Sequence, residues 1–193
     1  MIHLRGMMVN QMRLSNVKVR TKILMVAGVP MLMAALIGGI SLWGLFKMET
    51  AAGWVDHTHE VLTQADHVVS SAVNMETGMR GFTISGEDAF LEPYISGTKS
   101  FTETIEALKQ TVSDNPPQVA RLVDAQATIG EWQSKVAEAQ IAERRLVGVS
   151  ATMDDMVEFA ANAGGKAYFD KFRGIMQEFS DIESNLLVSR TAE

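Results

Sequence analysis

The sequence contains no cysteine among its 193 residues, which excludes disulfide bonds and any metal site built on thiolates. It also lacks the Gly-x-Ser-x-Gly turn that presents the nucleophile of many serine hydrolases. No group of residues has the pattern of a nucleophile beside its activating base. We therefore expect that the protein is not an enzyme and that it uses neither a cofactor nor a metal ion.

Charged residues are absent from residues 23–46, which form a continuous apolar run. A helix over these residues would be about 36 Å long, which is sufficient to cross a bilayer. A cleaved secretion signal is the alternative, although its apolar core is usually only about 7–15 residues long. The small residues Thr50, Ala51 and Ala52 leave that alternative open. We expect an uncleaved transmembrane helix over residues 23–46.

Acidic residues are absent from residues 1–46, and the five basic residues there are Arg5, Arg13, Lys18, Arg20 and Lys22. The remaining 147 residues hold 12 basic and all 23 acidic residues, which gives them a net charge of −11. The positive-inside rule therefore predicts a cytoplasmic basic N-terminus over residues 1–22 and places residues 47–193 outside the cell membrane. The acidic outer segment argues against nucleic acid as a partner.

Runs of β-branched and aromatic residues are rare in residues 47–193, so the sequence offers little support for strands. Apolar residues recur instead at alternating steps of four and three, as in helices that pack at a shallow angle. We expect helices over about 47–83, 88–113, 116–147 and 166–191. Their mostly short connections predict an all-α, up-down-up-down four-helix bundle. We expect it to be membrane-anchored, with its first helix continuous with the transmembrane helix.

The predicted core follows one apolar stripe on each helix. The stripe residues are Trp54, Thr58, Val61, Ala65, Val68, Ala72, Met75, Met79 and Phe82; Phe90, Tyr94, Thr98, Phe101, Ile105, Leu108 and Val112; Val119, Leu122, Ile129, Trp132, Val136 and Ala139; and Tyr168, Phe172, Ile175, Phe179, Ile182 and Leu186. The longest connection, residues 148–165, has room for a short helix at 154–161. Asp88 and Asn115 are expected to cap the helices that follow them.

The stretch METGMRGFTISGEDAFLEPY, residues 75–94, is the most distinctive motif of the sequence. Its glycines do not have the spacing of a nucleotide-binding loop, and no strand is expected before it. The structural interpretation is a corner between two helices. Glu76 and Arg80 lie four residues apart, as in a stabilising pair on one helix face. Gly81 or Gly86 can take the left-handed conformation that ends a helix.

Four apolar residues of the same stretch are expected to pin this corner to the core. They are Phe82, Phe90, Leu91 and Tyr94, and Pro93 is expected in or just after the first turn of the following helix.

A ligand site at the membrane-distal end of the bundle is the alternative interpretation. Counting along the helices places Arg80 near the level of Lys166, Asp170 and Arg173. The basic side chains of such a cluster can hold a carboxylate or a phosphate by charge-assisted hydrogen bonds. Lys166 and Asp170 are themselves four residues apart, so ion pairs within the bundle are the competing explanation.

Three of the four histidines lie close together in sequence, at His57, His59 and His67, near Asp56 and Glu60. A weak metal-binding or pH-sensing site is one interpretation of this group. The spacing matches no established zinc pattern, which favours a solvated acidic helix face instead.

The 75–94 stretch resembles the signature of the third class of CHASE domain, an extracellular sensory module of bacterial receptors. The matching residues are Glu76, Arg80, Gly81, Phe82, Gly86, Phe90, Leu91, Pro93 and Tyr94. A second family stretch is matched by Gly165, Lys166, Asp170, Glu183, Leu186, Leu187 and Arg190. The resemblance covers essentially residues 47–193. Met79 departs from the family pattern, which more usually has a polar residue such as Gln there.

The resemblance implies a periplasmic four-helix sensor in the inner membrane of a bacterium, usually a homodimer, which responds to a small-molecule or protein ligand. It also implies a cytoplasmic signalling module downstream, which in this family belongs to a chemotaxis transducer, a histidine kinase or a cyclic-dinucleotide enzyme. Residues 12–24 resemble the start of methyl-accepting chemotaxis proteins, which favours the transducer and suggests Met12 as the initiator. A ligandless membrane-anchored scaffold bundle is the alternative from another functional class.

The last expected helix returns toward the membrane and ends close to Glu193. This geometry predicts a second apolar run of about 20 residues soon after Glu193. We expect the sequence to be a fragment of a larger receptor or the product of a truncated reading frame.

Overall fold

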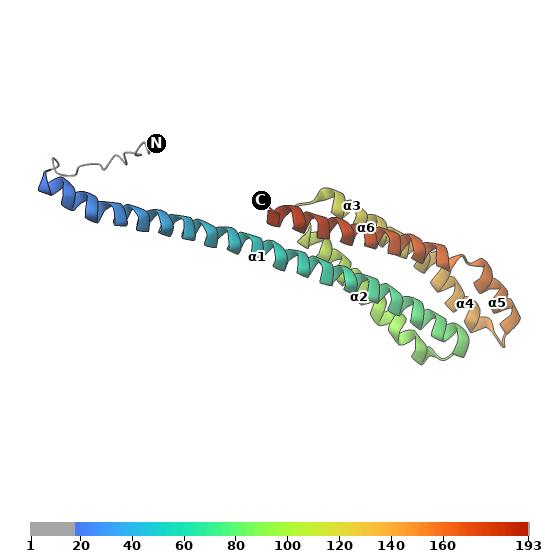
Figure 1. Ribbon diagram of the computed structural model, residues 1–193. Coiled ribbons are helices and arrows are strands. Elements are labelled where there is room, and N and C mark those ends of the chain that lie inside the picture. The colour runs from blue at the N-terminus through green and yellow to red at the C-terminus, as the bar shows by residue number, and fades with distance from the viewer. Residues whose placement is uncertain (1–17, 193) are drawn as a thin grey trace, which may run out of the picture. The chain divides into compact units, whose positions relative to one another are not determined.

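The computed structural model describes residues 18–192, and this part of the chain is almost entirely helical and contains no β-strand (Figure 1). The prediction of an all-α protein is confirmed over the described residues. Predictions that concern Arg5, Arg13 and the possible initiator Met12 lie outside them. Contacts within the chain divide it into two units, Met1–Thr50 and Ala51–Glu193.

The described part of the first unit is the beginning of helix α1 (Val19–Ser85). Its large apolar side chains are exposed, among them Leu32, Ile37 and Trp43. Pro30 lies inside the helix, as proline often does in membrane helices. By length and composition α1 can cross a membrane, and its most apolar stretch of 18 residues is not buried.

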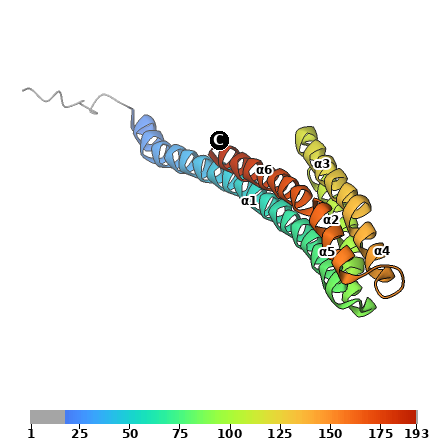
Figure 2. The same ribbon diagram turned by 90° about the vertical axis from the view of Figure 1, so that its right-hand side faces the viewer.

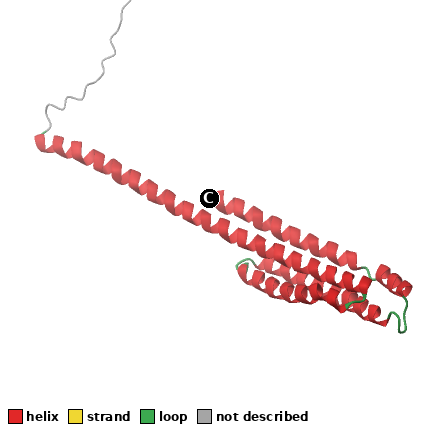
Figure 3. Ribbon diagram, turned by 90° about the horizontal axis from the view of Figure 1, so that it is seen from below, coloured by secondary structure: helices red, strands yellow, loops and turns green. Residues whose placement is uncertain are grey.

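The second unit contains the end of α1 and all later elements. These are the 3-10 turn η2 (Asp88–Leu91), α2 (Glu92–Thr111), α3 (Pro116–Trp132), the π-helical turn η3 (Gln133–Ala137), α4 (Glu138–Leu146), α5 (Met153–Asn162) and α6 (Gly165–Ala192). Short loops join them (Figure 3). α5 occupies the place of the short helix expected at 154–161, whereas η3 interrupts the continuous helix expected over 116–147.

Local chemistry explains where several helices begin and end. Gly86 has a φ of 74°, and its N–H donates to the Phe82 carbonyl across 2.7 Å, which ends α1. Asn115 precedes α3, but its side chain makes no capping bond; its carbonyl accepts from the Gln118 N–H instead. Asp88 lies inside η2 and does not cap it, because Glu87 occupies the N-cap position.

Helices of the second unit pack through side-chain pairs from α1, α2, α3 and α6, and α6 lies beside α1 and α3 (Figure 2). The pairs are Gln64–Thr111 and Ser71–Ser100 between α1 and α2, Lys109–Gln126 between α2 and α3, Arg121–Glu178 and Trp132–Phe169 between α3 and α6, and Glu76–Arg173 between α1 and α6.

The apolar core lies between these helices. The predicted stripe of α1 is confirmed from Thr58 to Phe82, all of whose residues are buried, and Trp54 is half-buried. On α2 the stripe is buried from Phe101 to Val112. Phe90 is an error in the prediction, because its side chain is 47% exposed. Residues 88–91 form a 3-10 turn, and Leu91 takes the buried position in place of Phe90.

The predicted stripe of the last helix is partly wrong. The buried seam of α6 contains Phe169, Phe172, Met176, Phe179 and Glu183. The residues predicted at 168, 175, 182 and 186 flank this seam and are only half-buried. The prediction missed Phe169 and Met176 because each has an apolar neighbour, Tyr168 or Ile175, that fits the same spacing. It missed Glu183 because it followed apolar side chains alone.

Candidate functional site

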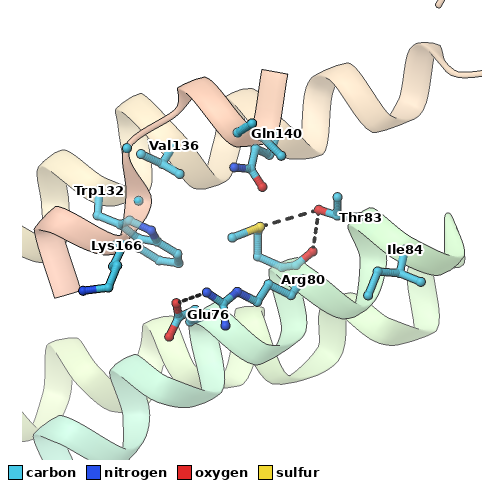
Figure 4. A pocket seen from close by; sticks show the side chains of 13 residues that line it. Glu76, Arg80, Thr83, Ile84, Trp132, Val136, Gln140 and Lys166 are labelled. Carbon is cyan, nitrogen blue, oxygen red and sulfur yellow. Dashed lines mark hydrogen bonds and ion pairs between the residues drawn. The ribbon is translucent and has the colours of Figure 1, made fainter. Parts of the chain in front are cut away.

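A pocket of about 370 Å³ opens in the second unit, between the distal part of α1, the α3–η3–α4 segment and the α5–α6 connection (Figure 4). The residues that line it are Glu76, Met79, Arg80, Thr83, Ile84, Trp132, Val136, Gln140, Ala160, Ala161, Gly164, Gly165 and Lys166. Its volume lies in the range of small-molecule sites in proteins, which is roughly 300–1,000 Å³. The pocket therefore brings the corner motif of residues 75–94 together with the start of α6.

Two arginines share one carboxylate at the rim of the pocket. An Oε atom of Glu76 lies 2.8 Å from the guanidinium of Arg80, and its other Oε atom lies 3.8 Å from that of Arg173. The Glu76 side chain is only 12% exposed, whereas those of Arg80 and Arg173 are more than half exposed. The predicted pair of Glu76 and Arg80 is present within α1, and the contact of Glu76 with Arg173 joins α1 to α6.

Lys166 reaches the opposite side of the rim from the first turn of α6, where it forms an ion pair with Asp170. Of the four predicted ligand residues, Arg80 and Lys166 line the pocket. Asp170 and Arg173 do not line it. Asp170 pairs with Lys166, and Arg173 lies against Glu76 with its guanidinium 5.5 Å from the centre of the Phe169 ring.

The inner wall of the pocket is apolar. Trp132 and Val136 are buried, and the Trp132 ring meets the Phe169 ring edge-on at 5.0 Å. Met79 is buried as well, and its sulfur accepts a hydrogen bond of 3.6 Å from the Thr83 hydroxyl. The residue that departs from the CHASE pattern thus contributes to the wall.

Gln140 is a pocket residue that the sequence did not reveal. The residue is only 7% exposed, and its side-chain amide points into the pocket. Among the described residues it makes no side-chain hydrogen bond. The predicted stripe of the third helix ended at Ala139, one residue before Gln140, so it gave no signal for a polar pocket residue there.

The end of α5 and its connection to α6 line the pocket, and local features fix the two ends of this segment. Thr152 and Asp155 form a reciprocal capping box that begins α5. The Thr152 hydroxyl and then its backbone N–H donate to the Asp155 carboxylate and hold the pKa of Asp155 below its ordinary value. Gly164 has a φ of 65°, and a Cβ at Gly165 would come within 3.2 Å of Val136. Small residues therefore let the start of α6 approach the wall.

The rest of the corner motif packs α1 against α2. The Phe90 ring lies over Gly81, where a Cβ would come within 3.1 Å of it. Pro93 lies in the first turn of α2. Tyr94 is half-buried; burial raises the pKa of its phenol, and a hydrogen bond with Gln133 opposes that rise. These residues are structural in the sense that each holds two helices together.

Comparison with known families agrees with this geometry. Residues 51–193 match the family model of the CHASE3 domain, which covers nearly all of the second unit. The chain belongs to the CHASE3 domain family. CHASE3 is an extracellular sensory domain of signal-transduction receptors, so the recognition made from the corner motif is confirmed. Searches of curated proteins and of solved structures give no match to the chain.

The second family stretch begins at the pocket, which Gly165 and Lys166 line, and continues along α6 to Glu183 and Arg190. Glu183 is buried and accepts a hydrogen bond of 2.7 Å from the Gln118 amide. The guanidinium of Arg190 lies 4.1 Å from the centre of the Trp54 ring and 3.9 Å from an Asp114 oxygen. Both residues connect α6 to neighbouring elements.

The histidine-rich face of the CHASE3 domain is exposed at Asp56, His59, Glu60 and His67. His57 is half-buried, and its ring meets the Trp54 ring edge-on at 6.0 Å. Over residues 18–192, no three histidine or carboxylate side chains are grouped so that they could hold a metal ion. The described residues of this face therefore form no group of metal ligands.

Proposed function

We propose that residues 47–193 are the periplasmic sensory portion of a bacterial transmembrane receptor, which relays a stimulus through a displacement of α6. The observation that supports this best is the pocket, because its walls come from both α1 and the start of α6. A molecule held there interacts with two helices at once. It can therefore shift the equilibrium between two packings of α6 if it binds one of them more tightly.

The up-down-up-down arrangement belongs to this proposal. Its support is the order of the contacts between helices: Gln64 on α1 meets Thr111 on α2, whereas the later residue Ser71 meets the earlier residue Ser100. Opposite order along two helices is the property of antiparallel neighbours. In such a bundle the C-terminal end of α6 lies at the same end of the bundle as the residues of α1 that begin the second unit, near Ala51.

Membrane anchoring and orientation are further parts of the proposal. The exposed apolar surface of α1 in the first unit has the size and composition of a membrane span. Lys18, Arg20 and Lys22 lie immediately before this surface, which favours a cytoplasmic N-terminus. The proposed location is the bacterial inner membrane, with the CHASE3 domain in the periplasm and a second copy of the chain as its partner in a homodimer.

Among CHASE3-containing receptors we propose a methyl-accepting chemotaxis protein, on the resemblance of residues 12–24 to the start of such proteins. A sensor histidine kinase is the second candidate, supported by the same family membership. In both cases the residues described here bind and transmit, and the proposed role of this chain is not enzymatic.

The orientation is tested with alkaline phosphatase, which is active only after export. A fusion after residue 192 of the full chain is expected to be active in intact cells. Replacing Lys18, Arg20 and Lys22 together with Gln should lower that activity, because it removes the positive charge that holds the N-terminus inside. Replacing Lys99, Lys135 and Lys171 with Gln is the matched control and should leave it unchanged. An inactive fusion to the wild-type chain would contradict the proposed orientation.

The relay is tested by measuring the distance between α1 and α6. Because the chain has no cysteine, spin labels can be attached only to introduced cysteines at the exposed residues Thr63 and Ser184. With the full chain in nanodiscs, small-molecule fractions of a periplasmic extract are added. An active fraction is expected to shift the distance distribution by about 1–2 Å. A control pair at Thr63 and Glu103 reports α1 against α2 and should not shift. No change with any fraction would favour a ligandless scaffold.

A further inference from the structure

The amide of Gln140 indicates that the pocket accommodates a polar molecule. The residue as a whole is only 7% exposed, but its amide atoms are not among the enclosed atoms that lack a partner, so they remain accessible from the pocket. Polar groups at such a position usually have a hydrogen-bond partner. Gln140 has none among the described residues, and its amide points into the pocket. One water molecule needs only about 30 Å³. The pocket of about 370 Å³ has room for a molecule of many atoms.

The charges at the rim indicate the sign of that molecule. Of the charged residues that line the pocket, Arg80 and Lys166 are basic and Glu76 is acidic, so the lining carries one net positive charge. Outside the lining, Arg173 lies against Glu76 and Asp170 pairs with Lys166, and these two charges cancel. Because two guanidinium groups share the Glu76 carboxylate, Arg80 retains donors that can bind a second anion. A carboxylate matches the planar fork of an arginine.

The wall indicates that the molecule is organic. Met79, Trp132 and Val136 present apolar surface on the inner side of the pocket. Ile84 also lines the pocket and is exposed, and a hydrocarbon group would cover its side chain, which an inorganic anion would not. The π-helical turn η3 contains Val136, and π-helical turns are frequent at functional sites.

We propose that the pocket binds a small organic monocarboxylate that has a second polar group. Its carboxylate lies between Arg80 and Lys166, its hydrocarbon part packs against Met79, Trp132 and Val136, and its second polar group forms a hydrogen bond with Gln140. This inference rests on the proposed sensory function and names the chemical class of the stimulus. It also assigns the relay a starting point, since the ligand contacts the first turn of α6 through Lys166.

The binding test uses the full chain in nanodiscs and isothermal titration calorimetry. The probes are lactate, 4-hydroxybutanoate and 4-hydroxybenzoate, which share the proposed chemistry and differ in length, and each is compared with its neutral primary amide. At least one acid is expected to bind, and its amide should bind about tenfold more weakly. Inorganic phosphate is titrated as well and should not compete with the acid.

Two variants test the assigned residues. Arg80→Gln and Gln140→Leu should each weaken binding of the acid about tenfold. Lys135→Gln removes an equally exposed cation from the same domain, outside the pocket, and should leave binding unchanged. Gln140→Leu keeps the side-chain size and removes an unpaired amide, so its melting temperature should not fall. A role of Gln140 in folding alone would lower the melting temperature without a specific loss of affinity.

Several results would overturn the inference. They are binding by none of the three acids, equal binding of acids and amides, competition by phosphate, or unchanged affinity in both pocket variants. The spin-label pair at Thr63 and Ser184 separates this inference from the proposed function. A distance shift caused by another molecule, without binding of the acids, would refute the ligand class and leave the relay intact. Binding of an acid without any shift would support the site and contradict the relay.

Discussion

The amide nitrogen of Gln118 lies 2.7 Å from a carboxylate oxygen of Glu183, and both residues are buried between α3 and α6. The same amide nitrogen also donates to the Phe179 carbonyl across 3.1 Å, and the guanidinium of Arg121 donates to the amide oxygen across 3.2 Å. A buried polar group is tolerated only when its hydrogen bonds are satisfied. Glu183 therefore depends on Gln118.

Replacing Gln118 with Leu should destabilise the protein, because it leaves the Glu183 carboxylate buried without its donor. We expect the free energy of unfolding to fall by about 2–4 kcal/mol, measured by urea denaturation. The double variant Gln118→Leu with Glu183→Leu should recover most of that loss, since both polar groups are then removed. A single variant within about 0.5 kcal/mol of wild type would show that the pair contributes nothing to stability.

The close approach of α1 and α2 gives a second prediction. A Cβ at Gly78 would overlap the backbone nitrogen of Tyr94, and a Cβ at Gly97 would come within 2.8 Å of the Ser71 carbonyl. Gly78→Ala and Gly97→Ala should each lower the free energy of unfolding by about 1–3 kcal/mol, because backbone atoms must move apart.

Gly130→Ala and Gly174→Ala are the matched controls, since a Cβ at either position meets no atom within 4 Å. Both glycines lie inside helices, so alanine should stabilise the protein by about 0.5–1 kcal/mol. Thermal denaturation of the four variants measures both effects. A loss of stability in the controls as large as that in Gly78→Ala would mean that close approach is not the cause.

The sequence predicted the core of α1 well and that of α6 poorly, for a reason that the two seams make clear. From Thr58 to Phe82 nearly every seam position holds an apolar residue, so the period is visible. On α6 the seam contains Glu183, and half-buried apolar residues such as Tyr168 flank it. Periodicity cannot distinguish Phe169 from Tyr168 in the seam, because adjacent apolar residues fit the spacing equally well. It also cannot reveal Glu183, because burial of a carboxylate there depends on Gln118 of another helix.

The candidate site was predictable only in part. Counting residues along two helices was enough to place Arg80 and Lys166 near one level, and both line the pocket. The role of Gln140 was not predictable, because it depends on which groups of α1 face α4. The π-helical turn η3, which precedes α4, has no recognisable sequence signal here.

The capping box of α5 predicts a pH dependence of the pocket wall. The pKa of Asp155 is lower in the folded protein than its ordinary value of 3.8, chiefly because the Thr152 hydroxyl donates to it. Its contribution to stability is therefore complete above that ordinary value and is lost as the pH falls through the lower folded value. Hydrogen exchange should show α5 opening more readily at acidic pH than at neutral pH, relative to the other helices.

Asp155→Asn is the control for that experiment, because it cannot titrate. At neutral pH the variant should exchange faster than wild type in α5, and the difference should shrink progressively as the pH falls below 3.8. A constant difference between variant and wild type across the whole pH range would contradict the assignment to Asp155.

The stacking of Arg190 on Trp54 predicts how the end of α6 is held. The guanidinium lies 4.1 Å from the ring centre, and one of its terminal nitrogens is buried without a hydrogen-bond partner. Trp54→Leu should therefore destabilise the last turns of α6 by about 0.5–2 kcal/mol, because it removes the ring and leaves the guanidinium uncompensated. Arg190→Met should cost less, since it keeps an apolar stem against the ring and removes the unpaired nitrogen. Hydrogen exchange of α6 measures both, with the exposed Lys99→Met as a neutral control. Equal exchange rates in Trp54→Leu and wild type would show that this contact does not hold α6.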